Sequence, residues 1–290
     1  FMTNNNVTIT RFAPSPTGFL HIGHIASMLF ALDYAEKFNG ELLLRIEDID
    51  FTRCKNEFTN EIVSDLNWLK IPFRRTKNQS LRKKFYINAL KFLKEKDLIY
   101  ECWLSRSESL KVLSAPHNLS KNNVLNDTDL FLSKSEIQKR KLSGDKPAWR
   151  LRMKKSLEYA KLSGEDMSWE DVYCGKFRIE PEKFGDVVIA RKDISTSYNL
   201  SVTIDDHYDG VTHVTRGDDL FEITHIHRLI QIILSLNKTK WIHHPLILDQ
   251  NGNRLAKRNK SLSIKSLKKQ GLSPYEILLL ARKELNKSKK

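Results

Sequence analysis

The first fifty residues alternate between strand-like and helix-like patterns of apolar positions. Residues 7–12 have the alternation of a short strand. From Ile25 onward apolar side chains recur every three or four residues, as on one helix face, and Asn39-Gly40 is a typical helix end. Residues 42–46 form an apolar run that favours a buried parallel strand. A strand, a helix and a parallel strand in this order predict an α/β fold with a crossover helix.

Similar patterns predict further helices and strands along the rest of the chain. The predicted helices are 57–69, 80–97, 220–236, 263–270 and 274–285, and the predicted strands are 99–103, 148–153, 186–190, 200–204, 211–215 and 245–248. Ser105 and Glu108 have the spacing of a helix capping box. Residues 109–147 lose periodicity and are rich in Ser, Asn and Lys, which indicates a partly irregular insertion.

The positive charge of the chain is concentrated in two segments. The sequence of 290 residues carries 49 Lys and Arg against 35 Asp and Glu, a net charge of +14. Residues 70–96 contribute a net +9 and residues 254–290 a net +10, so the remainder is mildly acidic at −5. Two separate basic patches favour a polyanion such as nucleic acid as partner, and a solvated Lys-rich surface is the alternative.

Composition argues against membrane-spanning and secreted classes of protein. The 40% hydrophobic content is sufficient for a globular core, and no run approaches the roughly 18 apolar residues that cross a bilayer. The start of the chain lacks the apolar core of a secretion signal. Three widely spaced cysteines, Cys54, Cys102 and Cys174, fit a reducing compartment better than a disulfide framework. We therefore expect a cytoplasmic protein without a membrane partner.

The segment with the most chemical information runs from Arg11 to His24 and reads RFAPSPTGFLHIGH. Its loop delivers His21 and His24 to the N-terminus of a helix, where unpaired amide groups favour phosphate. Gly23 allows a ligand to lie against the backbone, and both imidazoles can donate hydrogen bonds to phosphate oxygens. Two histidines at this spacing are, on their own, more often surface or capping residues, so the wider sequence context decides.

This segment and five others occur in the order found in the glutamyl-tRNA synthetase group of class I aminoacyl-tRNA synthetases. The other five are LRIEDID at 44–50, SYNL at 197–200, Asp205-Asp206, HVTRGDDL at 213–220 and NRLAKR at 253–258. The last of them takes the place of the family's KMSKS loop. The sequence resembles this family from about residue 8 to residue 275, which implies a Rossmann-like α/β catalytic core that uses ATP and L-glutamate.

The resemblance and the length of the chain imply a division into four segments. They are the first half of the nucleotide-binding core at 7–104, an inserted α+β subdomain at about 105–185, the second half of the core with the KMSKS-like loop at 186–262, and a short basic helical segment at 263–290. We expect no helical anticodon-binding domain. A stand-alone core of this length is similar to the glutamyl-queuosine tRNA(Asp) synthetases, which attach glutamate to the queuosine base at the anticodon wobble position.

The resemblance also implies roles for individual side chains. The implied glutamate-binding residues are Arg11, Phe12, Ala13, Pro14, Ser15, Glu47, Tyr198 and Arg216. Arg11 and Arg216 would meet the substrate carboxylates, because guanidinium pairs with carboxylate through two hydrogen bonds, and Glu47 would pair with the α-ammonium. Either arginine can hold the side-chain carboxylate. The alternatives are structural ion pairs, for Glu47 within its run of acids and for Arg216 with Asp218 or Asp219.

The implied ATP site joins two motif regions, Pro14 to His24 and Arg254 to Arg258. Its residues are His21, Gly23, His24 and Lys257, of which His21, His24 and Lys257 are the catalytic set. Lys257 would neutralise the phosphates of departing pyrophosphate. The loop departs from KMSKS because Arg254, Ala256 and Arg258 replace a lysine and two serines, whereas Lys257 is kept. Mg²⁺ is expected with ATP, bound through phosphate oxygens, and we name no protein ligand for it.

We expect no zinc site. Members of the family often carry Cys-x-Cys after the strand that contains Tyr100, whereas this chain has Cys102-Trp103-Leu104. One cysteine and one candidate histidine, His117, fall short of the four ligands of a structural site. Two histidine pairs are instead expected to face RNA or solvent, with their rings pointing apart in the first: His225 with His227, and His243 with His244.

The implied macromolecular partner is the anticodon stem-loop of tRNA(Asp). The basic patches at 70–96 and 254–290 would contact its phosphates while the modified base enters the site, and we expect a monomeric protein. One alternative is the catalytic fragment of an ordinary glutamyl-tRNA synthetase, which charges the 3′ end of tRNA(Glu). Another is a catalytically silent RNA-binding paralogue, against which the retained His21, His24 and Lys257 argue.

Overall fold

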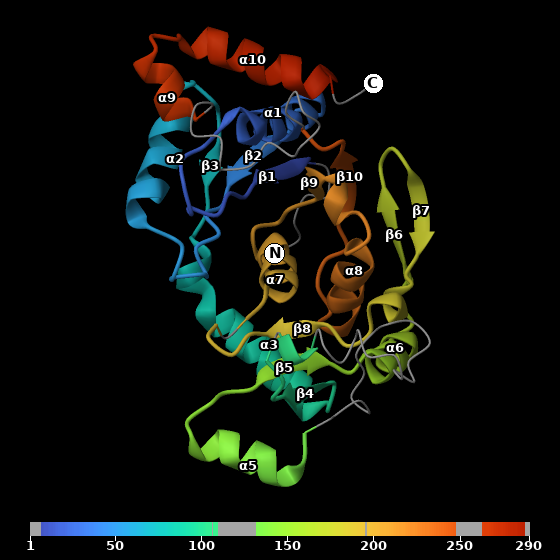
Figure 1. The fold of residues 1–290 in the computed structure, drawn as a ribbon. Coiled ribbons are helices and arrows are strands. Elements are labelled where there is room, and N and C mark those ends of the chain that lie inside the picture. Colours follow the sequence, from blue (N-terminus) through green and yellow to red (C-terminus); the bar gives the residue numbers. More distant parts are fainter. Residues whose placement is uncertain (1–6, 106, 110–131, 195, 248–262, 288–290) are drawn as a thin grey trace.

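The computed structural model describes residues 7–105, 107–109, 132–194, 196–247 and 263–287, and Figure 1 shows the fold. The N-terminal half of the core is a parallel sheet of three strands, β1 (Ile9–Phe12), β2 (Glu41–Leu44) and β3 (Arg74–Arg75). Helix α1 (Ile22–Lys37) crosses from β1 to β2, which confirms the predicted βαβ opening. The long helix is almost entirely buried on its sheet side, through side chains such as Ile25, Met28 and Leu29.

A second sheet of four strands continues the core. Its strands are β6 (Ser168–Asp171), β7 (Gly175–Arg178), β9 (His213–Gly217) and β10 (Lys240–His244), in the order β7-β6-β10-β9. β10 is parallel to both β9 and β6, and β7 closes an antiparallel hairpin with β6. β1 lies beside β9, since the Thr212 amide donates to the Ile9 carbonyl at 3.0 Å. The two sheets therefore share one carboxyl-terminal edge.

A third, antiparallel sheet lies away from the parallel core. It contains β4 (Ile99–Cys102), β5 (Ala148–Leu151) and β8 (Val188–Ala190). Helix α5 (Lys134–Leu142) extends beyond it at one end of the molecule, and α6 (Met153–Leu162) follows β5 (Figure 1). The division of the chain at residues 104, 185 and 262 stays a prediction.

The other helices cover the core and close the chain. They are α2 (Asn56–Trp68), α3 (Lys83–Glu95), α7 (Tyr198–Tyr208), α8 (Thr224–Ile233), α9 (Ile264–Lys269) and α10 (Pro274–Lys287), with short 3₁₀ turns at Gln79–Arg82, Pro181–Phe184 and Asp218–Leu220. α10 buries Ile277, Ala281 and Leu285 in the same apolar cluster as α1. Figure 1 separates α10 from α3, so these two helices of the predicted basic segments lie on different parts of the molecule.

Two predicted strands are wrong. Residues 200–204 belong to α7, which Ser197 caps by accepting a hydrogen bond from the Leu200 amide. Residues 200–206 of this helix are all buried, so no polar face was present to mark its helical period. The strand predicted at 245–248 lies earlier, as β10, which ends at His244; residues 245–247 are not in a strand, and residue 248 lies outside the described residues. Pro245 has no N–H for a ladder.

Elsewhere the differences are smaller. The capping box at Ser105 is confirmed, because the Ser105 amide donates to Glu108 at 2.6 Å and the Glu108 amide to the Ser105 hydroxyl at 3.1 Å. Helix α6 and the β6–β7 hairpin were not predicted. At the end of α1, the left-handed residue is Asn39 (φ 50°), whereas Gly40 is needed because a Cβ there would lie 1.9 Å from the Thr8 carbonyl oxygen.

Candidate functional site

A polar cavity of about 200 Å³ opens at the carboxyl-terminal edge of the parallel strands. Ser15 and Thr17 reach it from the loop after β1, Glu47 from the segment after β2, and Tyr198 from the start of α7. Arg191, which follows β8, completes one side. Ligands of α/β proteins bind at this edge of a parallel sheet, and the cavity contains three of the residues expected to bind glutamate.

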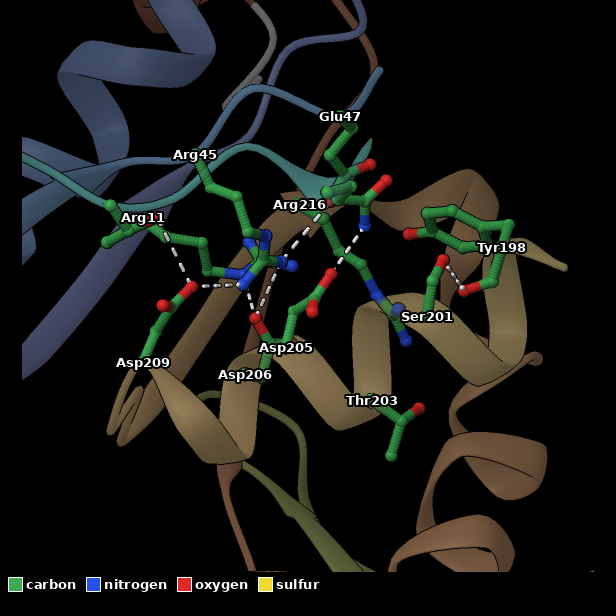
Figure 2. A network of polar contacts seen from close by, with 12 residues as sticks. Arg11, Arg45, Glu47, Tyr198, Ser201, Thr203, Asp205, Asp206, Asp209 and Arg216 are labelled. Carbon is green, nitrogen blue, oxygen red and sulfur yellow. Dashed lines mark hydrogen bonds and ion pairs between the residues drawn. The ribbon is translucent and has the colours of Figure 1, made fainter. Parts of the chain in front are cut away.

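Glu47 is held by a fully buried arginine that the sequence analysis had not singled out. Arg45 lies 3.2 Å from Glu47, 2.8 Å from Asp206 and 3.0 Å from Asp209, and Figure 2 shows this cluster. Burial raises the pKa of Glu47 to about 7, an effect that the cations of Arg45 and Arg11 oppose. Glu47 is thus a carboxylate whose charge a bound cation would stabilise.

Arg11 is already paired with a carboxylate. Its Nε lies 3.2 Å from Asp206 Oδ1, and its Nη1 donates to the Thr215 carbonyl at 2.6 Å. Phe12, Ala13 and Pro14 follow on the same segment, where the Phe12 carbonyl accepts from the Arg45 amide and the Pro14 carbonyl accepts from the Glu47 amide. These backbone bonds fix the two loops beside each other and shape the cavity wall.

Arg216 has different partners. Its guanidinium donates to Thr224 Oγ1 at 2.6 Å, to His227 Nδ1 at 2.9 Å and to His243 Nε2 at 3.1 Å. All three acceptors are neutral groups, rather than the Asp218 or Asp219 considered as structural partners. Burial lowers the pKa of Arg216, and the nearby Tyr198 opposes that shift. The structure therefore holds a buried cation close to Tyr198 without a carboxylate hydrogen-bonded to it.

His21 and His24 lie at the N-terminus of α1, as predicted. Their rings are stacked with centroids 3.7 Å apart, and the His21 amide donates to His24 Nδ1 at 3.2 Å. An imidazole nitrogen that accepts a hydrogen bond carries no proton, so neutral His24 carries its proton on Nε2. Gly23 lies in the first turn of α1, between the two histidines.

The second motif region, Arg254 to Arg258 with Lys257, lies outside the residues that the structure describes. The chain is described again from Ser263, which forms a β-bridge with His21, and the Ile264 amide donates to the Leu20 carbonyl at 2.8 Å. Ser263 and Ile264, which begin the next described segment, therefore lie beside the histidine motif.

The two additional histidine pairs do not face solvent, so that prediction is wrong. His225, His227 and His244 are buried, and the side chain of His243 is 2% exposed. His225 accepts the Glu180 amide at 2.9 Å, whereas His227 contacts Arg216, so the two rings do point apart along α8. The sequence contained a signal for this burial, because Ile226 lies between the two histidines and Ile230 follows one turn later on the same helix.

Other groups that shape the site escaped the sequence analysis. The most important are Arg45, Asp209, His227 and His243. A signal existed for Arg45, which lies between Leu44 and Ile46 in an apolar strand where a charge requires a partner.

Across the described ranges, no group of three or more His, Cys, Asp or Glu side chains is arranged to hold a metal ion. No helix in those ranges is sufficiently long and apolar to cross a membrane.

An α/β core with a histidine motif at a helix N-terminus and a polar cavity at the carboxyl-terminal edge of its parallel strands is typical of class I aminoacyl-tRNA synthetases. Residues 7–284 match the family model described as tRNA synthetases class I (E and Q), catalytic domain. The chain belongs to this family, and it is a ligase of the aminoacyl-tRNA synthetase type. Members of the family generally use ATP with Mg²⁺.

Named relatives lie within the glutamate branch. The chain is 39% identical to a glutamyl-Q tRNA(Asp) synthetase of Rhodobacter capsulatus, over 93% of this chain and 98% of the relative. It is 33% identical to a glutamyl-Q tRNA(Asp) synthetase of Symbiobacterium thermophilum, over 92% and 83% of the two chains. The crystal structure of a glutamate-tRNA synthetase from Elizabethkingia anophelis superposes with a TM-score of 0.67 at 25% identity. That match covers 87% of this chain but only 52% of the Elizabethkingia chain.

Proposed function

We propose that this protein activates L-glutamate with ATP and transfers it to the queuosine base of tRNA(Asp). The observation that carries the proposal is the pairing of two opposite buried groups near one cavity, the cation of Arg216 and the carboxylate of Glu47. The similarity to two glutamyl-Q tRNA(Asp) synthetases supports the choice of acceptor. The alternative, which the Elizabethkingia structure supports, is transfer to the 3′ end of tRNA(Glu).

Glutamate recognition follows from the charges of the site. A substrate with an α-ammonium and a side-chain carboxylate offers Glu47 a cation and Arg216 an anion. Arg216 suits this task better than Arg11, because Asp206 already neutralises Arg11 at 3.2 Å. Tyr198 and Ser15 would contact the remaining polar atoms. A neutral amide in place of the side-chain carboxylate would leave Arg216 poorly compensated, so glutamine is rejected.

The phosphate chemistry is assigned to the two motif regions. In the activation step, an oxygen of the glutamate α-carboxylate attacks the α-phosphorus of ATP, and the bond to the departing pyrophosphate breaks. The His24 Nε2–H and the amide groups at the start of α1 would donate to phosphate oxygens, and Lys257 would neutralise the leaving group. Mg²⁺ enters with ATP and supplies shielding of the phosphate charge when bound.

A second cavity supports RNA as the acceptor. It measures about 520 Å³ and lies between α3, β5 and the end of β8. Its basic side chains are Lys91, Lys94, Lys146, Arg191 and Lys192, against Glu101 and Asp193. Trp149 also lines it, with Lys94 Nζ 3.7 Å from the ring centroid. Cations beside an aromatic face suit a nucleotide strand, and Arg191 also lines the glutamate cavity.

The test is transfer of radiolabelled glutamate to purified tRNAs. We expect labelling of queuosine-containing tRNA(Asp) and of its isolated anticodon stem-loop, with no labelling of tRNA(Asp) that lacks queuosine. Labelled glutamine should give no product. Nuclease digestion then locates the label on the anticodon nucleoside.

Labelling of the 3′-terminal adenosine of tRNA(Glu) would replace the proposal with its alternative. Glutamate-dependent pyrophosphate exchange without tRNA separates the steps, because it reports activation alone. Exchange without tRNA favours the proposal, because ordinary glutamyl-tRNA synthetases require tRNA for activation. Absence of exchange until tRNA is added would favour the alternative, absence of exchange with tRNA would reject glutamate activation, and exchange without transfer would reject only the acceptor.

A further inference from the structure

Two buried histidines surround the guanidinium of Arg216. His243 comes from β10 and accepts from Arg216 Nε at 3.1 Å, and His227 comes from α8 and accepts from Arg216 Nη1 at 2.9 Å. A guanidinium has only donors, so each imidazole nitrogen that faces it must be unprotonated. The other ring nitrogen of each histidine then determines its tautomer.

The outer nitrogens have acceptors of their own. His243 Nδ1 lies 2.8 Å from Asp171 Oδ2, and His227 Nε2 lies 3.0 Å from Asn199 Oδ1. Each outer nitrogen therefore carries the proton and donates it, which fixes both histidines as neutral rings of opposite tautomer. The hydrogen bonds form one chain, Asp171–His243–Arg216–His227–Asn199.

The Asp171 end of this chain is buried and held by backbone hydrogen bonds. Asp171 is fully buried on β6 and accepts backbone N–H groups from Tyr173 and Cys174, both at 2.9 Å. Burial would raise the pKa of Asp171, but these bonds and the one from His243 lower it to about 2. Burial likewise lowers the pKa of His243 and holds that of His227 well below its ordinary value. The carboxylate of Asp171 is therefore separated from Arg216 by the imidazole ring of His243.

We propose that His227 and His243 are positioning residues that determine selectivity for an acidic substrate. They orient Arg216 through neutral acceptors and leave its positive charge available to a substrate carboxylate. A carboxylate in either position would orient the guanidinium equally well but would neutralise it. This inference rests on the proposed function, in which Arg216 meets a carboxylate of glutamate.

The test compares two substitutions that differ only in charge. An asparagine or aspartate oxygen at position 227 lies where His Nδ1 accepts from Arg216, so His227→Asn keeps a neutral acceptor and His227→Asp supplies an anion. We expect His227→Asn to retain glutamate affinity within about threefold. His227→Asp should lose roughly tenfold to a hundredfold, the value of one hydrogen bond to a charged group. Calorimetric titration with glutamate and with ATP measures both, and ATP affinity should not change.

Equal glutamate affinities of the two variants, whether both are weak or both are normal, would overturn the inference, because packing alone would then explain the histidine. A second measurement is independent of substrate. The ring nitrogen shifts of His227 and His243 in a ¹⁵N-labelled protein should be those of neutral tautomers at pH 7, and a cationic ring would overturn the inference. Absence of glutamate binding by the wild-type protein would instead reject the proposed function, while the nitrogen shifts still decide this point.

Discussion

The two candidate arginines for carboxylate recognition, Arg11 and Arg216, have opposite electrostatic surroundings. Arg11 belongs to a buried cluster in which it and Arg45 share Asp206, while Arg45 and Arg82 share Asp209 (Figure 2). Among the described residues, the hydrogen-bond partners of Arg216 are neutral groups: two histidines, a threonine and Tyr198. An arginine whose charge is matched inside the protein holds the structure together, whereas one whose charge is unmatched can bind an anion.

The cluster is built around α7. Asp205, Asp206 and Asp209 all lie on or next to the last turns of this helix, and their partners come from β1, the end of β2 and the 3₁₀ turn before α3. Gln79 and Tyr86 complete the bonds of Asp205, at 2.7 Å and 2.8 Å. A buried charge is tolerated only where such partners are supplied, so this network aligns both halves of the core with the cavity.

The largest expected effect is a difference in the free energy of unfolding between substitutions of Arg45, in the ion-pair cluster, and of Arg216. Arg45→Met leaves Glu47, Asp206 and Asp209 without their shared cation, so we expect a loss of about 3–5 kcal/mol in the free energy of unfolding. Arg216→Met removes hydrogen bonds to neutral groups and should cost no more than about 2 kcal/mol. Urea unfolding without ligands measures both changes.

Arg74→Met is the matched control, because Arg74 forms an exposed ion pair with Glu41. We expect a loss of less than about 1 kcal/mol there. If Arg45→Met and Arg216→Met destabilised the protein equally, the distinction between a structural and a binding arginine would fail.

The next largest effect is on the rate of pyrophosphate exchange, which should fall while the KM for glutamate stays nearly constant. Removing the imidazole in His24→Ala deletes a donor to the phosphate charge of the transition state, so pyrophosphate exchange should slow about a hundredfold, or about 3 kcal/mol. The KM for glutamate should remain nearly constant, since His24 does not line the glutamate cavity. Lys257→Ala should behave in the same way.

His207→Ala is the control, because His207 lies near the end of α7 and its imidazole accepts from the Asn237 amide, away from the histidine motif. Its exchange rate should equal that of the wild-type protein. A His24→Ala variant with normal exchange would remove the histidine motif from the phosphate chemistry.

A smaller effect follows from the raised pKa of Glu47. The ammonium of the substrate needs an ionised Glu47, which is about one-tenth ionised at pH 6 if its pKa is about 7. Glutamate affinity should therefore weaken roughly tenfold between pH 8 and pH 6, and binding near pH 7 should release about half a proton. Calorimetric titrations in buffers of different ionisation enthalpy measure that proton, and Glu47→Gln should abolish the dependence.

The raised pKa of Glu47 affects folding stability in the direction opposite to its effect on glutamate binding. The pKa of Glu47 is higher in the folded protein than its ordinary value of 4.5, so its contribution to stability is full below pH 4.5 and is lost as the pH rises through 7. The two histidines beside Arg216 have lowered pKa values, and their contribution is full above about pH 6.5 and is lost at lower pH. Glutamate binding that did not change between pH 6 and pH 8 would remove Glu47 as the partner of the ammonium.

The sequence predicted those parts of the fold whose polar and apolar residues segregate in space. The βαβ opening, α10 and the capping box at Ser105 have local signals, and all three are confirmed. α7 was taken for a strand because burial on all sides removed its helical period. β6 pairs with β10, about seventy positions away, and no local pattern reports such a partner; among the described strands, β7 pairs only with β6.

The candidate site shows the same limit. Local motifs identified Arg11, Glu47 and Arg216 through a family resemblance. Motif spacing gives no information about which charged side chains pair with each other. That information depends on Asp171 and His243, which are far apart in sequence and 2.8 Å apart in the structure. The difference between Arg11 and Arg216 therefore emerged only from three-dimensional contacts.

The smallest expected effect concerns an arginine that belongs to neither region. Arg282 on α10 forms a two-pronged ion pair with Asp33 on α1, at 2.7 Å and 2.9 Å, but its side chain is 48% exposed. Solvent screens such a pair, so Arg282→Ala should cost about 0.5 kcal/mol in the free energy of unfolding and leave pyrophosphate exchange unchanged. The attachment of α10 to α1 depends instead on apolar contacts.

Ile277→Ala provides the contrast on the same helix. Ile277 is completely buried in the cluster shared with α1, and its truncation should cost about 2–5 kcal/mol through lost burial and the cavity left behind. Urea unfolding of the two variants, followed by intrinsic tryptophan fluorescence, measures the difference. If Arg282→Ala destabilised the protein as much as Arg45→Met, solvent exposure would not be what separates weak arginine pairs from strong ones in this molecule.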